Sequence, residues 1–156
     1  MESIQIPDRL ARLERQVAEL QRTGWERDEL PFYPTSLRSM PYEDSTTFTS
    51  VWETILAPRT ATLAVGLVTI GDQVSSTSTG GEWQVVLNDS TVALSGTIAA
   101  TFSYEFPAGV IDLLPYRGAP TVKVQIKARR TSGATTGGKW GTGGAVAVSP
   151  RYAQLL

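Results

Sequence analysis

The sequence predicts a mainly β protein, an antiparallel, jelly-roll-like β-sandwich preceded by a short N-terminal coiled-coil helix. Three observations lead to this prediction. Apolar and polar residues alternate in several segments after residue 45, as in antiparallel strands with one face in water. Thirteen of the fourteen glycines follow residue 40, so turns are expected there. Before that point, Arg, Glu, Leu and Gln recur at helical spacing.

Residues 7–23, PDRLARLERQVAELQRT, are predicted to form the helix. Pro7 suits the first helical position because its missing N–H would be unpaired there, and Gly24 suits the residue just beyond the end. A narrow apolar stripe at heptad positions a and d is typical of a coiled-coil seam. We predict that this oligomerisation seam consists of Ile6, Leu10, Leu13, Val17 and Leu20.

The helix leaves two questions open. Two heptads are marginal by themselves, and an amphipathic helix that lies on its own domain is the alternative to a seam. Val at position a with Leu at position d favours two strands, whereas the β domain that follows leads us to prefer a homotrimer. We expect the chain to bind copies of itself, with the number of helices left open.

Residues 25–45 are predicted to be a Pro-rich extended linker between the helix at 1–24 and the β-sandwich domain at 46–156. Pro31, Pro34 and Pro41 interrupt any helix or central strand. The segment also carries aromatic residues, which a free tether would not need. We therefore expect it to attach to a surface, with a neighbouring subunit as one candidate.

Within the β domain, strands are expected near 46–56, 60–70, 82–88, 91–98, 100–106, 121–131 and 144–154. Alternation also predicts that five aromatic residues belong to the core, with a sugar-stacking platform as the alternative. They are Trp52, Trp83, Phe102, Tyr104 and Phe106.

Composition narrows the function classes. The chain of 156 residues has a net charge of -1, so it offers no basic face for nucleic acid and no polybasic membrane patch. It has no Cys and no His, which removes thiol nucleophiles, zinc–thiolate sites and the Ser-His-Asp triad. We expect no enzyme activity, no cofactor and no metal. The N-terminus lacks the pattern of a secretory signal, so synthesis in the cytoplasm is expected.

Carboxylates after residue 40 are expected to cap turns or lie on solvated faces. Glu82 and Glu105 are the alternative pair for glycoside hydrolysis, which needs two carboxylates across a cleft. Asp72 or Asp112 with backbone carbonyls could hold calcium, but no EF-hand spacing supports this.

The Gly-rich residues 131–144 are expected to form a long hairpin loop between the last two strands. They are not a phosphate loop, because the required spacing and the strand–helix context are missing. Lys139 and Trp140 are the predicted ligand or partner contacts, since an exposed indole needs something to pack against. Nearby, Lys127, Arg129 and Arg130 are expected to be a solvated strand face, with docking of an acidic partner as the alternative.

Asp112, Leu113, Tyr116 and Gly118, followed by the alternating strand at 122–126, resemble a recurrent segment of jelly-roll domains. It is similar to a turn in galactose-binding-like and carbohydrate-binding modules. The resemblance implies a scaffold segment that feeds a core strand, and it says little about a ligand.

The layout of a short heptad helix, a Pro-rich joint and a Thr/Ser/Gly-rich β domain resembles small virion proteins of tailed phages that infect actinobacteria. This resemblance implies a minor tail, fibre or head-decoration subunit in the virion, with other virion proteins as partners. The alternative function is a non-catalytic module that binds host-surface glycans.

Overall fold

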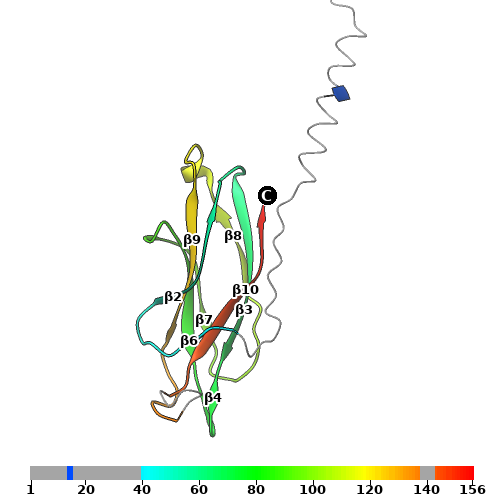
Figure 1. Cartoon of the computed structure of the whole chain (residues 1–156). Helices are drawn as coiled ribbons and strands as arrows, with labels where there is room; N and C mark the ends of the chain where they lie inside the picture. Colours follow the sequence, from blue (N-terminus) through cyan, green and yellow to red (C-terminus); the bar gives the residue numbers. More distant parts are fainter. Residues whose placement is uncertain (1–13, 16–39, 138–142) are drawn as a thin grey trace, which may run out of the picture.

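The computed structural model describes residues 14–15, 40–137 and 143–156, and these contain two four-stranded antiparallel sheets packed as a sandwich (Figure 1). One sheet has the order β1-β10-β3-β8, formed by Tyr42–Glu43, Val146–Leu155, Thr62–Gly71 and Ala108–Asp112. The other has the order β2-β9-β6-β7, formed by Thr49–Leu56, Val122–Arg130, Gly81–Leu87 and Thr91–Ile98. A small hairpin pairs β4 (Gln73–Val74) with β5 (Thr77–Ser78). The predicted mainly β, antiparallel sandwich is confirmed.

The predicted N-terminal helix lies almost wholly outside the described residues. Glu14 and Arg15 are helical and exposed. The seam residues Ile6, Leu10, Leu13, Val17 and Leu20 are outside the described ranges, so the coiled coil stays a prediction. Among the described residues, no helix is long and apolar enough to span a membrane.

The core is the layer between the two sheets, built by alternate residues of β3, β6, β9 and β10. Period-two alternation directs every second side chain inward, and many of these positions hold Val or Ile, which pack well on a pleated surface. The buried cluster includes Leu63, Val65, Leu67, Trp83, Val85, Leu87, Val122, Val124, Ile126, Val146 and Val148. Trp83 is therefore a core residue, as predicted.

A second, smaller apolar cluster lies on the opposite face of the first sheet. Met40 is buried there with Val68, Ile70 and Ala147, and Tyr42 packs against them. The chain thus enters the sandwich through β1, inside the segment predicted as a linker. This entry fixes Met40 and Tyr42 beside the first residues of β10.

The prediction of a strand at 100–106 is wrong. Phe102 has a φ of 47°, which strand residues do not adopt, and only an isolated bridge joins Glu105 to Thr69. The next strand, β8, begins at Ala108. Here the chain must cross from β7 in one sheet to β8 in the other, so this connection cannot be a continuous strand.

The hairpin expected between the last two strands is also wrong. β9 pairs with β2 and β6, whereas β10 belongs to the other sheet, so the connection crosses the sandwich. Its described ends are tied together, since Arg130 Nη1 donates to the carbonyls of Ala134 at 2.9 Å and Gly144 at 3.3 Å. Lys139 and Trp140 lie in its undescribed part.

The segment from Asp112 to Gly118 forms a tight turn, as expected for this sequence. Asp112 Oδ1 accepts a bond from the Leu114 N–H at 2.9 Å, and a 3-10 helix, η2, covers Leu114–Tyr116. Gly118 has a φ of 94°, which glycine adopts without steric cost. The turn buries Leu113 completely and leads into the core strand β9.

Two adjacent leucines of this turn provide a matched test of the core. Leu113 is 0% exposed and Leu114 is 53% exposed. Leu113→Ala should lower the free energy of unfolding by about 2–5 kcal/mol, because it leaves a cavity. Leu114→Ala should change it by less than about 0.5 kcal/mol. Urea unfolding measures both, and equal effects would show that Leu113 does not hold the core.

Candidate binding surface

Both sheets end on the same side of the sandwich. β1 pairs with β10 only through Tyr42↔Ala147 and Glu43↔Val146. Beyond Ala147, no described strand pairs with the edge of β10 that faces β1. β2 is the terminal strand of the other sheet, and a hydrogen bond from Trp52 to Val148 shows that it lies next to this edge. An open flank therefore separates β2 from the second half of β10.

This flank contains an apolar cleft of about 690 Å³, which we call the flank cleft. Its volume is within the range of small-molecule and peptide-side-chain pockets. The two walls are lined by Trp52, Thr54 and Leu56 of β2 and by Pro150, Ala153 and Leu155 of β10. Buried core side chains also line it, namely Leu63, Val65, Val124 and Ile126. The cleft thus opens directly onto the interior layer.

Trp52 joins the two sheets at the flank cleft. Its indole Nε1 donates a hydrogen bond of 2.8 Å to the carbonyl of Val148 on β10. The side chain is 36% exposed, so the prediction that Trp52 is a core residue is wrong. It lies at the sheet edge because β2 is the last strand of its sheet, with no neighbour beyond it to cover the ring.

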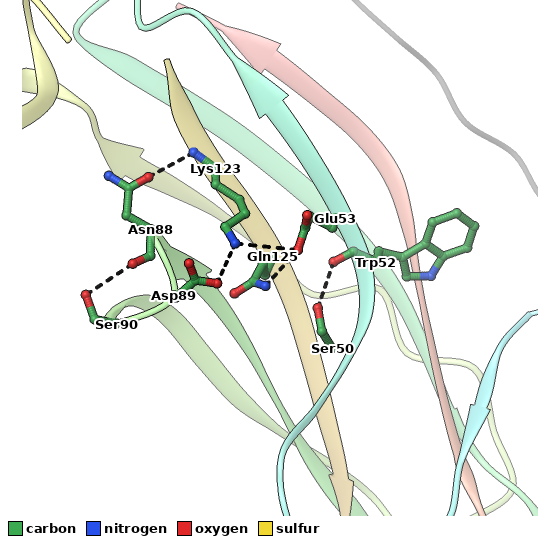
Figure 2. Close-up of polar contacts among 8 residues, drawn as sticks. All are labelled: Ser50, Trp52, Glu53, Asn88, Asp89, Ser90, Lys123 and Gln125. Carbon is green, nitrogen blue, oxygen red and sulfur yellow. Dashed lines mark hydrogen bonds and ion pairs between the residues drawn. The ribbon is translucent and has the colours of Figure 1, made fainter. Parts of the chain in front are cut away.

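The outer face of β2 carries a polar cluster instead (Figure 2). Lys123 Nζ lies 2.6 Å from Asp89 Oδ1 and 3.9 Å from Glu53 Oε2. Gln125 Nε2 donates to Glu53 Oε2 at 2.8 Å. The hydrogen bond to the Asp89 carboxylate raises the pKa of Lys123, and the charges of Asp89 and Glu53 act in the same direction while desolvation opposes them.

The charged groups of this polar cluster are paired with one another, whereas Gln125 Oε1 is buried without a hydrogen-bond partner among the described residues. The turn next to it is held by Asn88 Oδ1, which accepts a bond from the Lys123 backbone N–H at 2.9 Å (Figure 2). Exposed ion pairs of this kind contribute little to stability. The cluster therefore orders the turn between β6 and β7, and it presents no unpaired charge for a ligand.

The two carboxylates considered for glycoside hydrolysis have separate structural partners. Glu82 Oε2 accepts bonds from Arg129 at 2.6 and 2.9 Å, and the Arg129 guanidinium also lies over the Phe48 ring at 4.6 Å. Glu105 Oε2 accepts a bond from the Ala99 N–H at 3.4 Å. Glu82 lies in β6, whereas Glu105 lies in the β7–β8 connection and bridges to Thr69 of the other sheet, so the structure gives them no shared site.

The two carboxylates considered for calcium binding also accept hydrogen bonds from nearby backbone groups. The Asp72 carboxylate accepts a bond from the Gln73 N–H at 2.8 Å, and Asp112 caps the turn described above. In the described part of the chain, no group of three or more His, Cys, Asp or Glu residues could hold a metal ion. Two of the three basic residues of β9 are likewise engaged, with Arg129 on Glu82 and Arg130 in the β9–β10 connection.

Three of the aromatic residues predicted to be buried lie at the surface. Phe102, Tyr104 and Phe106 are all exposed, Phe106 to 60%, which corrects the prediction. The Arg151 guanidinium lies 4.8 Å from the Phe106 ring centre. On the first sheet, the Tyr152 ring of β10 covers Gly66 of β3 so closely that a Cβ at position 66 would overlap the ring. These side chains and the exposed Val110 give the first sheet an apolar outer surface.

The flank cleft was missed by sequence reasoning. The strand predicted at 144–154 contains Ala153 but ends before Leu155, and its sequence does not indicate that this side of the sheet stays open. The only local signal was the Pro150-Arg151-Tyr152 sequence, where the strand contains a bulge between Pro150 and Tyr152. Lys139 and Trp140, the predicted contacts, lie outside the described residues.

No protein-family model and no curated protein sequence matches this chain significantly.

The Trp52 hydrogen bond gives a test of the flank. Trp52→Phe keeps an aromatic ring in β2 but removes the donor to the Val148 carbonyl, and should lower the free energy of unfolding by about 1 kcal/mol. Urea denaturation measures the loss. Ile55→Val on the opposite face of β2 is the control, and it should have a smaller effect. Identical stability of Trp52→Phe and the parent chain would contradict the role of this bond.

Proposed function

We propose that the chain is a structural subunit of a bacteriophage virion, either a minor tail or fibre protein or a capsid-decoration protein. It forms a homo-oligomer, for which we prefer a trimer. The observation that carries the proposal is the narrow heptad stripe Ile6, Leu10, Leu13, Val17 and Leu20, set apart from a β domain. The helix and linker anchor the subunit to other virion proteins, and the sandwich faces outward.

The surface of the sandwich supports a binding role of this kind. Exposed large apolar side chains, including Phe106 and Val110, lie outside the core. Apolar surface of this type is common where proteins contact one another. The buried cluster, by contrast, is supplied by the strands of the sandwich itself. A separate apolar stripe in the helix is then available for contacts between subunits.

We also infer that the sandwich is of the jelly-roll type. Eight strands in two four-stranded antiparallel sheets support this. So does the pairing of β10 near the end of the chain with β1 at its entry. Jelly rolls are common in virus capsid proteins and lectins, so the fold type is compatible with both functions considered for this chain.

Oligomerisation is the direct test. Light scattering of the purified chain at micromolar concentration should give the mass of an oligomer. Leu13→Asp with Val17→Asp should reduce this to the mass of one chain, because charges in the seam are desolvated by assembly. Circular dichroism should show that the β domain stays folded.

The matched control places the same two charges on the polar face of the predicted helix. Ala11→Asp with Ala18→Asp occupies position b of both heptads and should leave the mass unchanged. A parent chain that is monomeric would contradict the proposal, as would a seam variant that keeps the parent's mass. Location of the gene among head or tail genes would support the virion assignment.

A carbohydrate-binding module is the second candidate. The observation in its favour is the group of exposed aromatic residues Phe102, Tyr104 and Phe106 in the β7–β8 connection, since aromatic rings can stack on sugars. Trp140 is the sequence-predicted contact. In this function the chain would recognise a host-surface glycan without catalysis.

A glycan array separates this candidate from a purely structural subunit. Binding to a defined glycan, abolished by Trp140→Ala, is the expected result for a carbohydrate-binding module. Phe102→Ala tests whether the β7–β8 connection takes part. An array without signal at high protein concentration would remove this candidate and would leave the oligomerisation test unaffected.

A further inference from the structure

We propose that the flank cleft binds a linear fatty acid, with the hydrocarbon chain between the two sheets and the carboxylate on Arg59. The inference assigns a ligand class to the cleft and goes beyond the proposed virion role, on which it does not depend. Three features support it: the shape of the cleft, the exposure of the side chains on its floor and the charge at one of its ends.

The flank cleft is elongated, because strands form its two walls. One wall is β2 from Trp52 to Leu56, and the other is the second half of β10. At about 3.3 Å per residue, the β2 wall is about 13 Å long. The hydrogen bond from Trp52 to Val148 joins the walls at one end, and Arg59 of the β2–β3 connection lines the other. A cleft of this shape suits a linear chain better than a ring system.

The floor of the flank cleft is open to solvent. Val124 and Ile126 of β9 line it and remain 7% and 6% exposed, whereas Val122 and Ala128 on the same face of β9 are completely buried. Thr54 faces the same layer, since it pairs with Val124 across β2 and β9, yet it is exposed. The interior layer is therefore unsealed at this point, and a hydrocarbon chain placed here would remove apolar surface from water.

The floor offers hydrocarbon contacts rather than hydrogen bonds. It consists of Leu63 and Val65 from one sheet and Val124 and Ile126 from the other. A peptide segment inserted among these side chains would bring N–H and carbonyl groups that the floor leaves unpaired, which is costly. A hydrocarbon chain brings no such groups. The lining therefore favours an acyl chain over a peptide.

Arg59 supplies a positive charge at one end of the flank cleft. It is exposed, and within the described ranges its guanidinium forms no ion pair. Glu53, the acidic residue in the lining, instead contacts Lys123 and Gln125 on the outer face of β2. A fatty acid is ionised at neutral pH, and its carboxylate can accept charge-assisted hydrogen bonds from an arginine. The apolar cleft and the Arg59 charge at its end thus match an amphipathic anion.

Binding of dodecanoate to the full-length chain is the direct test, because its extended chain is about as long as the cleft. Titration calorimetry below the micelle-forming concentration should give one molecule bound per chain. A ligand that binds the folded state should also raise the melting temperature. 1-Dodecanol is the neutral comparison. Arg59→Gln should weaken dodecanoate binding about fivefold, as expected for an exposed ion pair, and should leave dodecanol binding unchanged.

Two variants block the flank cleft from opposite walls. Thr54→Trp and Ala153→Phe each place an aromatic ring in it, and each should weaken dodecanoate binding by about tenfold or more, because the ring takes the volume of the ligand. Val92→Trp is the control, at an exposed position of the terminal strand on the other edge of the β2 sheet, and it should bind as the parent does. Circular dichroism checks that each variant is folded, and the two walls belong to different sheets, so either variant alone suffices.

Four results would overturn the proposal. They are no binding by the parent chain, binding at the parent's affinity in the folded wall variants, an equal loss in Val92→Trp, and an equal effect of Arg59→Gln on dodecanoate and dodecanol. The oligomer mass is measured separately by light scattering, so failure here leaves the proposed function untouched.

Discussion

Burial of alternate side chains between the two sheets is the interaction on which the structure depends. Val85, Val122 and Val148 come from three different strands and are all completely buried. Each such side chain contributes about 1.5–3 kcal/mol when removed from water, so the layer rather than any polar contact holds the sheets together. The ion pairs described here involve side chains that are about a third or more exposed, and such pairs add little.

The same layer explains which parts of the fold could be predicted from the sequence. β9 alternates Val122, Val124 and Ile126 with polar residues, and the structure buries these three. β9 is an interior strand with a neighbour on each side, so the pattern and the burial agree. The burial of such an interior strand can therefore be predicted from its own residues. The small hairpin of β4 and β5 is too short to produce a pattern.

The β7–β8 connection shows where alternation misleads. Phe102, Tyr104 and Phe106 alternate with polar residues as a strand would, yet all three are exposed. Alternation reports which side chains share a face, but it does not report whether anything covers that face. The crossing between sheets decides this, and it depends on the strand order, which no local pattern contains. The flank cleft was missed for the same reason, because it arises where the edges of two sheets meet.

The flank cleft also bears on how the edges of the two sheets meet. An open strand edge beside an apolar cleft favours unwanted pairing between molecules, and among the described residues β10 has such an edge beyond Ala147. The Trp52 indole N–H occupies the Val148 carbonyl on this edge. This bond joins the terminal strand of one sheet to β10 of the other, so it fixes how the two sheet edges meet, while the apolar layer supplies most of the stability.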